Sequence, residues 1–174
     1  MDQGEIFRRV QERFGERILQ HIEHRGQHAV LIRPEHLREV VLYLRETPEL
    51  DFEMLMDVSG VDYLSYGDDR EWRFEVVYQL MSLRLNHRFR VKVAVVDDQV
   101  EVPSLWDLWR GANWMEREVF DLFGIRFLGH PNLRRILCHD DFVGHALRKD
   151  YPINRRQKLA RPVDSVLTDD PEWA

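Results

Sequence analysis

Three histidines and two adjacent aspartates in the last third of the chain carry groups that could bind a metal. They are His130, His139, His145, Asp140 and Asp141. Imidazole and carboxylate are common ligands of zinc and other divalent metals. Their spacing fits no standard metal-binding pattern, and the aspartate pair is typical of an exposed loop. We therefore expect no metal site, and a stand-alone metal-dependent enzyme is kept only as an alternative.

Three acidic residues at close spacing, Glu116, Glu118 and Asp121, could serve as an acid/base pair. Arg117 lies among them on the same predicted helix, so ion pairing is the favoured role. Asp121 lies in the last turn, where the helix macrodipole disfavours an anion, so it needs a cation nearby. The candidate cations are Arg117, Arg134 and Arg135. Because adjacent arginines cannot both face one partner, we expect one of the last two to hold Asp121 and the other to face outward.

Other chemical signatures are missing from the sequence. The pair Gly124 and Gly129 has phosphate-loop spacing, but no Lys-Ser/Thr follows it. No nucleophile motif surrounds Ser59, Ser65, Ser82 or Ser104. The single cysteine, Cys138, excludes an internal disulfide and a four-cysteine iron–sulfur site built by this chain alone. We expect no catalytic, cofactor-binding or metal-binding residue in the chain.

Length and composition are typical of one globular domain. The chain has 174 residues, of which 44% are hydrophobic and 32% charged, and its net charge is −6. This acidic balance argues against nonspecific nucleic-acid binding. No apolar run reaches the roughly 18–20 residues of a membrane helix, and the charged N-terminus lacks a signal-peptide core. We expect a cytosolic location, or a place on the cytosolic face of a membrane held by a partner.

The first predicted element is a helix. Apolar residues at helical spacing occupy residues 6–14, and Gly15 follows as a stop signal. Ile18, Leu19 and Ile22 continue the apolar spacing, which predicts one or two further helical turns.

A strand, a helix and a second strand are predicted next. The apolar run 28–32 is typical of a strand. Pro34 suits the first helical position and precedes an apolar stripe over residues 37–44. Residues 52–64 predict a strand, interrupted near Gly60 by a bulge.

Clean alternation over residues 72–80 and 89–95 predicts two more strands. Short turns join them to the preceding strand in an antiparallel meander. One face of each strand is apolar and the other mixed, so one face of the sheet should meet helices. The predicted fold is a two-layer α+β domain with a mostly antiparallel four-stranded sheet packed against helices.

The last predicted helix begins near Asn113, whose side chain can cap it while Glu116 reaches back. Gly124 ends it, because glycine adopts the left-handed conformation without a steric penalty. Three tryptophans nearby suggest an aromatic cluster, used either in core packing or in partner contact. They are Trp106, Trp109 and Trp114.

The end of the chain has a different character. Residues 1–153 are expected to form the domain, whereas residues 154–174 are too polar to fold alone and form an extended C-terminal tail. This tail is either a frayed end or a strap on a partner.

Two motifs carry a family resemblance. Residues 116–135 read E-R-E-x-x-D-x-F-G-I-x-F-x-G-H-P-x-L-R-R, and residues 144–152 read G-H-x-L-R-K-D-Y-P. Both resemble the signature of the 30 kDa subunit, also called the C subunit, of respiratory complex I, the proton-translocating NADH:quinone oxidoreductase. In the second motif Ala146 stands where proline is expected. The resemblance extends to the remainder of the chain only in length and element order.

The resemblance implies a cofactor-free structural subunit of the peripheral arm, on the cytoplasmic face of the cell membrane. Its implied partners are the large 49 kDa-type subunit (the D subunit), which helps form the quinone site, and the iron–sulfur subunits. FMN, iron–sulfur clusters, NAD and quinone would belong to the complex as a whole. Related subunits in membrane-bound hydrogenases and in ferredoxin-fed complexes are the alternative.

The charges of the two motifs have both signs and lie close together, which can set register between subunits because mispaired charges are costly. The predicted interface residues are Glu116, Arg117, Glu118, Asp121, Gly129, His130, Pro131, Arg134, Arg135, Arg148, Lys149 and Asp150.

Overall fold

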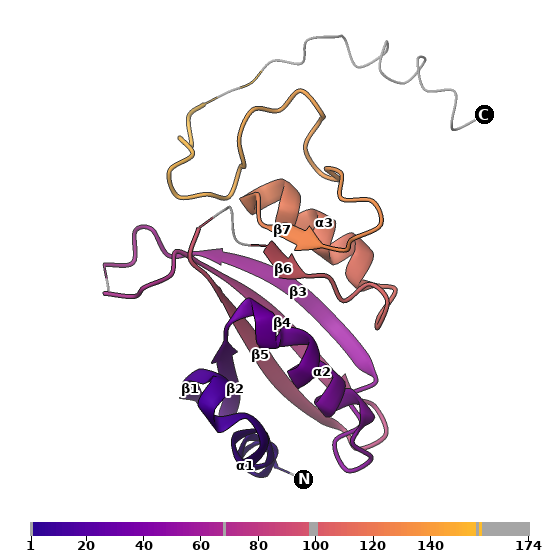
Figure 1. Ribbon diagram of the computed structural model, residues 1–174. Coiled ribbons are helices and arrows are strands. Elements are labelled where there is room, and N and C mark those ends of the chain that lie inside the picture. Colours follow the sequence, from indigo (N-terminus) through magenta and orange to yellow (C-terminus); the bar gives the residue numbers. More distant parts are fainter. Residues whose placement is uncertain (1, 68, 98–100, 156, 158–174) are drawn as a thin grey trace, which may run out of the picture.

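The structure is a computed structural model that describes residues 2–67, 69–97, 101–155 and 157 (Figure 1). Within these residues the chain forms a five-stranded sheet, a pair of short strands and three α-helices. The elements are α1 (Gln3–Phe14), β1 (Ile18–His24), β2 (Gln27–Ile32), α2 (Leu37–Glu46), β3 (Met54–Asp62), β4 (Phe74–Ser82), β5 (His87–Val95), β6 (Glu101–Pro103), α3 (Ala112–Phe123) and β7 (Arg126–Leu128).

The large sheet has the strand order β1-β2-β5-β4-β3. Neighbouring strands are antiparallel except β2 and β5, which are parallel. The α+β class and the two layers are confirmed, and the predicted meander is β3-β4-β5. The sheet nevertheless has five strands rather than four, and it is mixed.

The additional strand is β1, where the sequence predicted further helix. That prediction is wrong: after α1 a short 3₁₀ turn, Gly15–Arg17, leads directly into the strand. Ile18 and Ile22 share one face of either a helix or a strand, so their spacing does not separate the two. Arg25 and Gly26, both with positive φ, form the two-residue turn that pairs β1 with β2.

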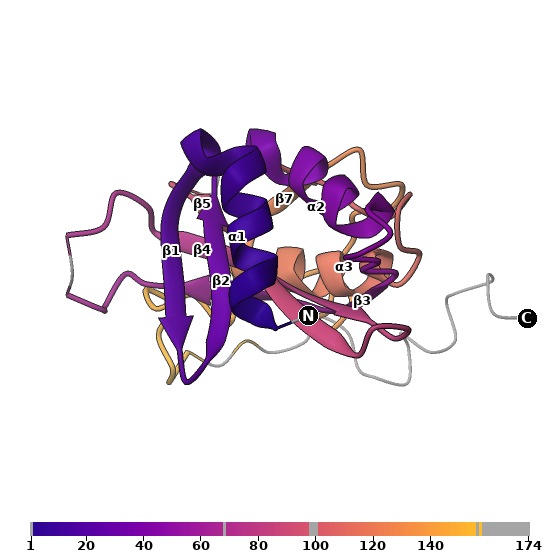
Figure 2. The ribbon, with the colours of Figure 1, turned by 90° about the horizontal axis from the view of Figure 1, so that it is seen from below.

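α1 and α2 cover one face of the sheet (Figure 2). α1 contributes three fully or almost fully buried side chains and α2 contributes four. The 3₁₀ turn Pro34–His36 leads into α2, as the proline predicted. These helical residues meet the alternating apolar side chains of β2, β4 and β5 in one core. The buried residues of the two helices are Ile6, Val10, Phe14, Leu37, Val40, Val41 and Leu44.

The opposite face of the sheet carries the mixed side chains expected there. Glu75 on β4 is only 2% exposed. Its carboxylate accepts hydrogen bonds from Lys92 Nζ (2.8 Å), Trp72 Nε1 (3.1 Å) and Tyr63 Oη (3.0 Å). These donors provide the hydrogen bonds that a buried carboxylate requires.

The irregularity of β3 lies between Leu55 and Asp57, not at Gly60 as predicted. Gly60 has a different role. A Cβ placed there would lie 2.6 Å from the ring of Phe123 on α3, so only glycine permits this close approach. Gly60 therefore fixes how α3 packs on the sheet.

Candidate subunit interface

The predicted interface residues lie on α3 and on the segment 124–151 that follows it. α3 begins without a side-chain cap, because Gly111 holds the N-cap position and Asn113 lies inside the helix. The predicted capping by Asn113 and Glu116 is therefore wrong. The predicted end is confirmed: Gly124 has φ 78°, and its N–H donates to the carbonyl of Phe120 (2.8 Å).

Asp121 is fully buried and anchors the segment that follows α3. Its Oδ1 accepts from Arg135 Nη1 (2.7 Å). Its Oδ2 accepts from the backbone N–H groups of Ile136 (3.0 Å), Leu137 (2.7 Å) and Cys138 (2.8 Å). Burial alone would raise the pKa of this carboxyl, but these donors outweigh it and lower the pKa. The cation predicted for Asp121 is thus Arg135.

Arg134 faces outward and is exposed, as expected for the second arginine of the pair. Arg117, by contrast, pairs with no carboxylate in the described part of the chain. Its Nε and Nη2 donate to the carbonyls of Arg134 and Arg135 (both 3.0 Å). The predicted ion pairing of Arg117 with its acidic neighbours is wrong, because the turn after α3 brings carbonyl acceptors to the guanidinium.

Glu116 points into the protein and is also fully buried. It accepts hydrogen bonds from Ser104 Oγ and from the backbone N–H of Leu105 (2.8 Å). Burial raises the pKa of its carboxyl to about 7. Glu116 therefore fastens the segment before α3 to the helix instead of pairing with an arginine.

The second motif caps the C-terminal end of α3. His145 Nδ1 lies 2.8 Å from the carbonyl oxygen of Asp121, and Leu147 N–H donates to the carbonyl of Leu122 (3.1 Å). Arg148 Nε donates to the carbonyl of Phe123 (2.5 Å). The last carbonyls of a helix have no partner within the helix, so these contacts complete it.

Lys149 and Asp150 are exposed but fixed in place through Asp62, a residue that no sequence pattern singled out. The carboxylate of Asp62 accepts from the backbone N–H of Lys149 (2.8 Å) and from Arg73 Nη2 (3.0 Å). Arg73 also pairs with Asp150 (2.8 Å). Asp62 and Lys149 lie 87 residues apart in the chain, so no local pattern could have predicted their contact.

His130 fixes the turn that begins at Gly129. Its Nδ1 accepts from the N–H of Asn132 (3.1 Å), which leaves Nε2 to donate to the carbonyl of Asn113 (3.0 Å). Gly129 has φ 80°, which favours glycine. Burial lowers the pKa of His130. Pro131 in the same turn is exposed, as is Glu118 on α3.

The three tryptophans do not form one cluster. Trp109 is 8% exposed and packs in the core, with Nε1 donating to the carbonyl of Glu53 (2.8 Å). Trp114 is 62% exposed. No ring contact among the described residues joins two of the three tryptophans. Trp109 thus lies in the core, Trp106 is half-buried, and Trp114 lies at the surface.

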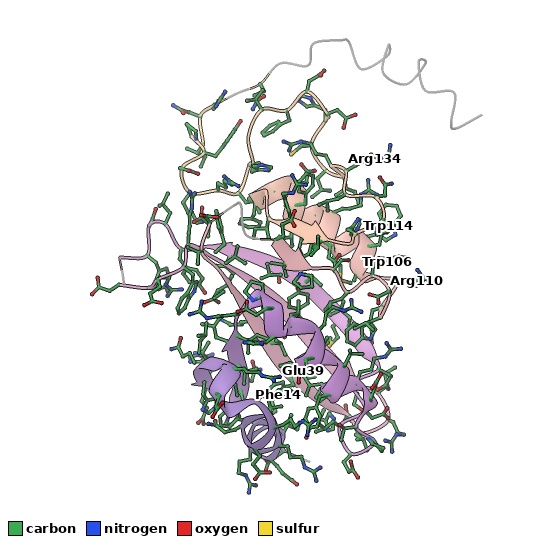
Figure 3. All side chains as sticks on the ribbon, viewed as in Figure 1. Phe14, Glu39, Trp106, Arg110, Trp114 and Arg134 are labelled. Carbon is green, nitrogen blue, oxygen red and sulfur yellow. The ribbon has the colours of Figure 1, made fainter. Side chains whose placement is uncertain are left out.

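The exposed Trp114 and the half-buried Trp106 each lie beside an arginine. The Arg110 guanidinium carbon lies 4.5 Å from the ring centroid of Trp106, and that of Arg117 lies 5.2 Å from Trp114. Figure 3 shows the labelled Trp106, Arg110, Trp114 and Arg134 on one side of the α3 half of the molecule. We call this surface the tryptophan strip: Trp106, Arg110, Trp114, Arg117 and Arg134.

The described residues include no group of three or more His, Cys, Asp or Glu side chains able to hold a metal ion. His130 and His145 instead make the backbone contacts described above. In the same part of the chain, no helix has the length and apolar character needed to cross a membrane.

Comparison with protein families identifies the chain. The family model described as "Respiratory-chain NADH dehydrogenase, 30 Kd subunit" matches residues 30–157. This range begins within β2 and includes β3, β4, β5, α3 and both motifs. The chain belongs to this family.

Individual relatives agree with the family. The C subunit of the NADH-quinone oxidoreductase of Roseiflexus castenholzii is 45% identical over 157 residues, which cover 90% of this chain and 88% of the relative. The corresponding C subunit of Thiobacillus denitrificans is 44% identical over 144 residues, covering 80% of this chain and 72% of the relative.

Solved structures share the fold. A trypsin-resistant fragment of Nqo5 (residues 1–134) is 35% identical, with a TM-score of 0.67, and the match covers 76% of this chain and all of the fragment. A chain of an archaeal membrane-bound sulfane sulfur reductase also gives a TM-score of 0.67, covering 87% of this chain and 86% of that one. At 22% identity, this second likeness concerns the fold alone.

Proposed function

We propose that this chain is a non-catalytic subunit of the peripheral arm of a proton-translocating NADH:quinone oxidoreductase. The family match over residues 30–157 carries the proposal. The chain docks on the large 49 kDa-type subunit that helps form the quinone site, beside the iron–sulfur subunits. The complex holds it at the cytoplasmic face of the cell membrane. NAD, FMN, the iron–sulfur clusters and quinone bind to other subunits.

The use of the motif residues supports a structural role. Asp121, Arg135 and Glu116 bind other parts of this chain, and Arg117 and Arg148 donate to backbone carbonyls. A reaction site would instead leave such groups facing a cavity that admits substrate. The motif residues therefore stabilise α3 and the segment that follows it, and so shape the surface that these two parts present.

The tryptophan strip is the part of that surface best suited to dock on the large subunit. Tryptophan and arginine are enriched among the residues that contribute most to binding energy in protein interfaces. The rings of Trp106 and Trp114 are held beside arginines before any partner binds, so less ordering is needed on association. Of the other exposed predicted residues, Lys149 and Asp150 remain candidates for polar contacts around it, and Gly129 and Pro131 for packing.

A paired substitution tests this docking surface. Trp114→Ala with Arg134→Ala should leave the fold unchanged but reduce recovery of the chain with membranes and NADH:quinone activity. Tyr66→Ala with Arg8→Ala is the matched control, because both side chains are exposed and lie on other elements. Equal recovery of the two variants would contradict the docking proposal.

The non-catalytic role has its own test. The purified chain should show no absorption band beyond the tryptophan region and no NADH oxidation. Added to membranes that lack it, the same chain should restore NADH:quinone activity. A stoichiometric chromophore or activity in the isolated chain would contradict the proposal.

A further inference from the structure

β3 forms one end of the large sheet, and among the described residues it pairs only with β4. Along the nine residues of β3, no strand of the described part of the chain lies on the side away from β4. No hydrogen bond between described residues uses a backbone group of residues 55–61 outside the pairing with β4. A strand edge with free N–H and C=O groups is a template for another strand.

The opposite edge of the sheet differs from β3 in its side chains. β1 has seven residues, closes a tight hairpin, and exposes four polar side chains and one apolar side chain, Leu19. β3 instead has Met54 and Met56 exposed by 40% and 36% beside the buried Leu55 and Val58. Charged side chains and bulges discourage edge pairing. The irregularity of β3 lies between Leu55 and Asp57, so the regular stretch from residue 57 to 61 is the part of this edge suited to a partner strand.

A groove of about 250 Å³ follows this edge between β3 and α3. Residues 57–60 form the strand side of the groove. Val119, Leu122 and Phe123 from α3, with Leu147 beyond it, form the apolar side. A side chain from an added strand would therefore have an apolar pocket next to its backbone pairing.

The groove also has an acidic border. Asp57 on β3 and Glu118 on α3 both line it and are both exposed. Asp57 accepts a hydrogen bond from Ser59 Oγ (2.8 Å). Neither carboxylate forms an ion pair with another described residue. One negative charge on each side of an apolar groove fits a segment that carries both apolar and basic residues.

We propose that β3 accepts an extended segment of a partner subunit as an additional strand of the sheet. An apolar side chain of that segment fills the groove, and a lysine or arginine lies between Asp57 and Glu118. The inference rests on the proposed role within a complex and adds a second contact, separate from the tryptophan strip. It identifies the partner region by its chemistry: extended, and alternating between apolar and basic residues.

Site-specific cross-linking in the intact complex tests the proposal. A photo-reactive amino acid replaces Ser59 in one variant and Trp114 in another, and both are irradiated in native membranes. We expect residue 59 to cross-link to a segment of another subunit that contains Lys or Arg. Cross-links from position 114 but none from position 59 would overturn this inference while leaving the proposed function intact. Cross-links from neither position, with no recovery in the complex, would overturn the proposed function itself.

The identity of the cross-linked segment decides between occupants. A cross-link from position 59 to residues 158–174 of the same chain, or to a second copy, would overturn the proposal in favour of that occupant. A cross-link to a helical or uniformly acidic segment of another subunit would overturn it as well, because neither can pair with the edge as described.

Hydrogen exchange and charge reversal test the backbone and the acidic border separately. We expect amide exchange in residues 54–61 to slow about tenfold or more when the chain enters the complex, because outward N–H groups gain acceptors. Asp57→Lys with Glu118→Lys should lower recovery in the complex about tenfold. Glu12→Lys with Glu49→Lys is the matched control on exposed sites elsewhere. Unchanged exchange, or equal recovery of the two charge-reversed variants, would overturn the proposal.

Discussion

The sheet with α1 and α2 surrounds an apolar core, whereas residues 129–151 are held on α3 by polar contacts. In the first region, buried side chains from α1, α2 and four strands of the large sheet pack together. In the second, exposed apolar residues such as Leu137 and Val143 accompany an anchor made by Asp121. Core burial is distributed over many side chains, while the second region depends on a few hydrogen-bonded groups. Substitutions should therefore act globally in the first region and locally in the second.

The largest effect is expected where the two regions meet. Phe123 is 7% exposed and its ring packs over Gly60. Phe123→Ala should lower the free energy of unfolding by about 3–5 kcal/mol, the usual cost of removing a buried phenylalanine ring. Denaturant unfolding measures this change, with Leu83→Ala, an exposed site, as control. A loss no larger than that of the control would show that α3 is not part of the cooperative core.

Glu116 should give the next largest effect, through pH. Its folded pKa of about 7 lies above its ordinary value of 4.5, so the folded state binds more protons between these values. The contribution of Glu116 to the free energy of unfolding is fully present below about pH 4.5. It decreases as the pH rises to about 7, by about 3 kcal/mol at most. Glu116→Gln should remove this slope, as measured by unfolding at pH 5, 6, 7 and 8. Parallel pH curves for the two proteins would contradict the prediction.

Loss of the Asp121 charge should loosen the second region and spare the first. Asp121→Asn keeps the shape but weakens the bonds to Arg135 and the three N–H groups, at about 1–3 kcal/mol. Trypsin should then cleave faster after Arg134 and Arg135, while the melting temperature changes less than in Phe123→Ala. Asp140→Asn, at an exposed site in the same segment, is the control. Equal cleavage rates in the two variants would show that other contacts hold the segment.

The smallest effect on stability is expected from the C-terminal tail, most of which lies outside the described residues. Deleting residues 158–174 retains the hydrogen bonds of Gln157 to Val143, whereas deleting residues 154–174 removes them. Both deletions should leave melting nearly unchanged, because those bonds are exposed. Both should lower recovery with membranes if the tail is a strap on the large subunit. Normal recovery and activity would make the tail a frayed end.

Much of the fold follows from local sequence patterns. The apolar stripe behind Pro34 predicted α2, alternation predicted β4 and β5, and Gly124 predicted the end of α3. Each rests on a repeat or a backbone preference that a few neighbouring residues specify. The motif over residues 116–135 likewise predicted the family, because its residue types stand at fixed places in a continuous stretch.

The failed predictions share a physical cause: contacts with other parts of the chain, and not local spacing, decided the outcome. Ile18 and Ile22 fit a helix or a strand equally well, and pairing with β2 decided for the strand. The sequence alone suggests that Glu116 is a surface acid. Only the fold places Ser104 and Leu105 beside its carboxylate.

Local patterns were thus sufficient to predict the family and most of the helices and strands. They also predicted that Asp121 needs a cation nearby. They could not specify that Arg135 meets Asp121, that Asp62 holds Lys149, or that β3 forms a free edge beside an apolar groove with an acidic border. Periodicity reports which face of an element is apolar. The partner of a buried charge and the neighbour of a strand depend on residues far along the chain, which only the folded arrangement brings together.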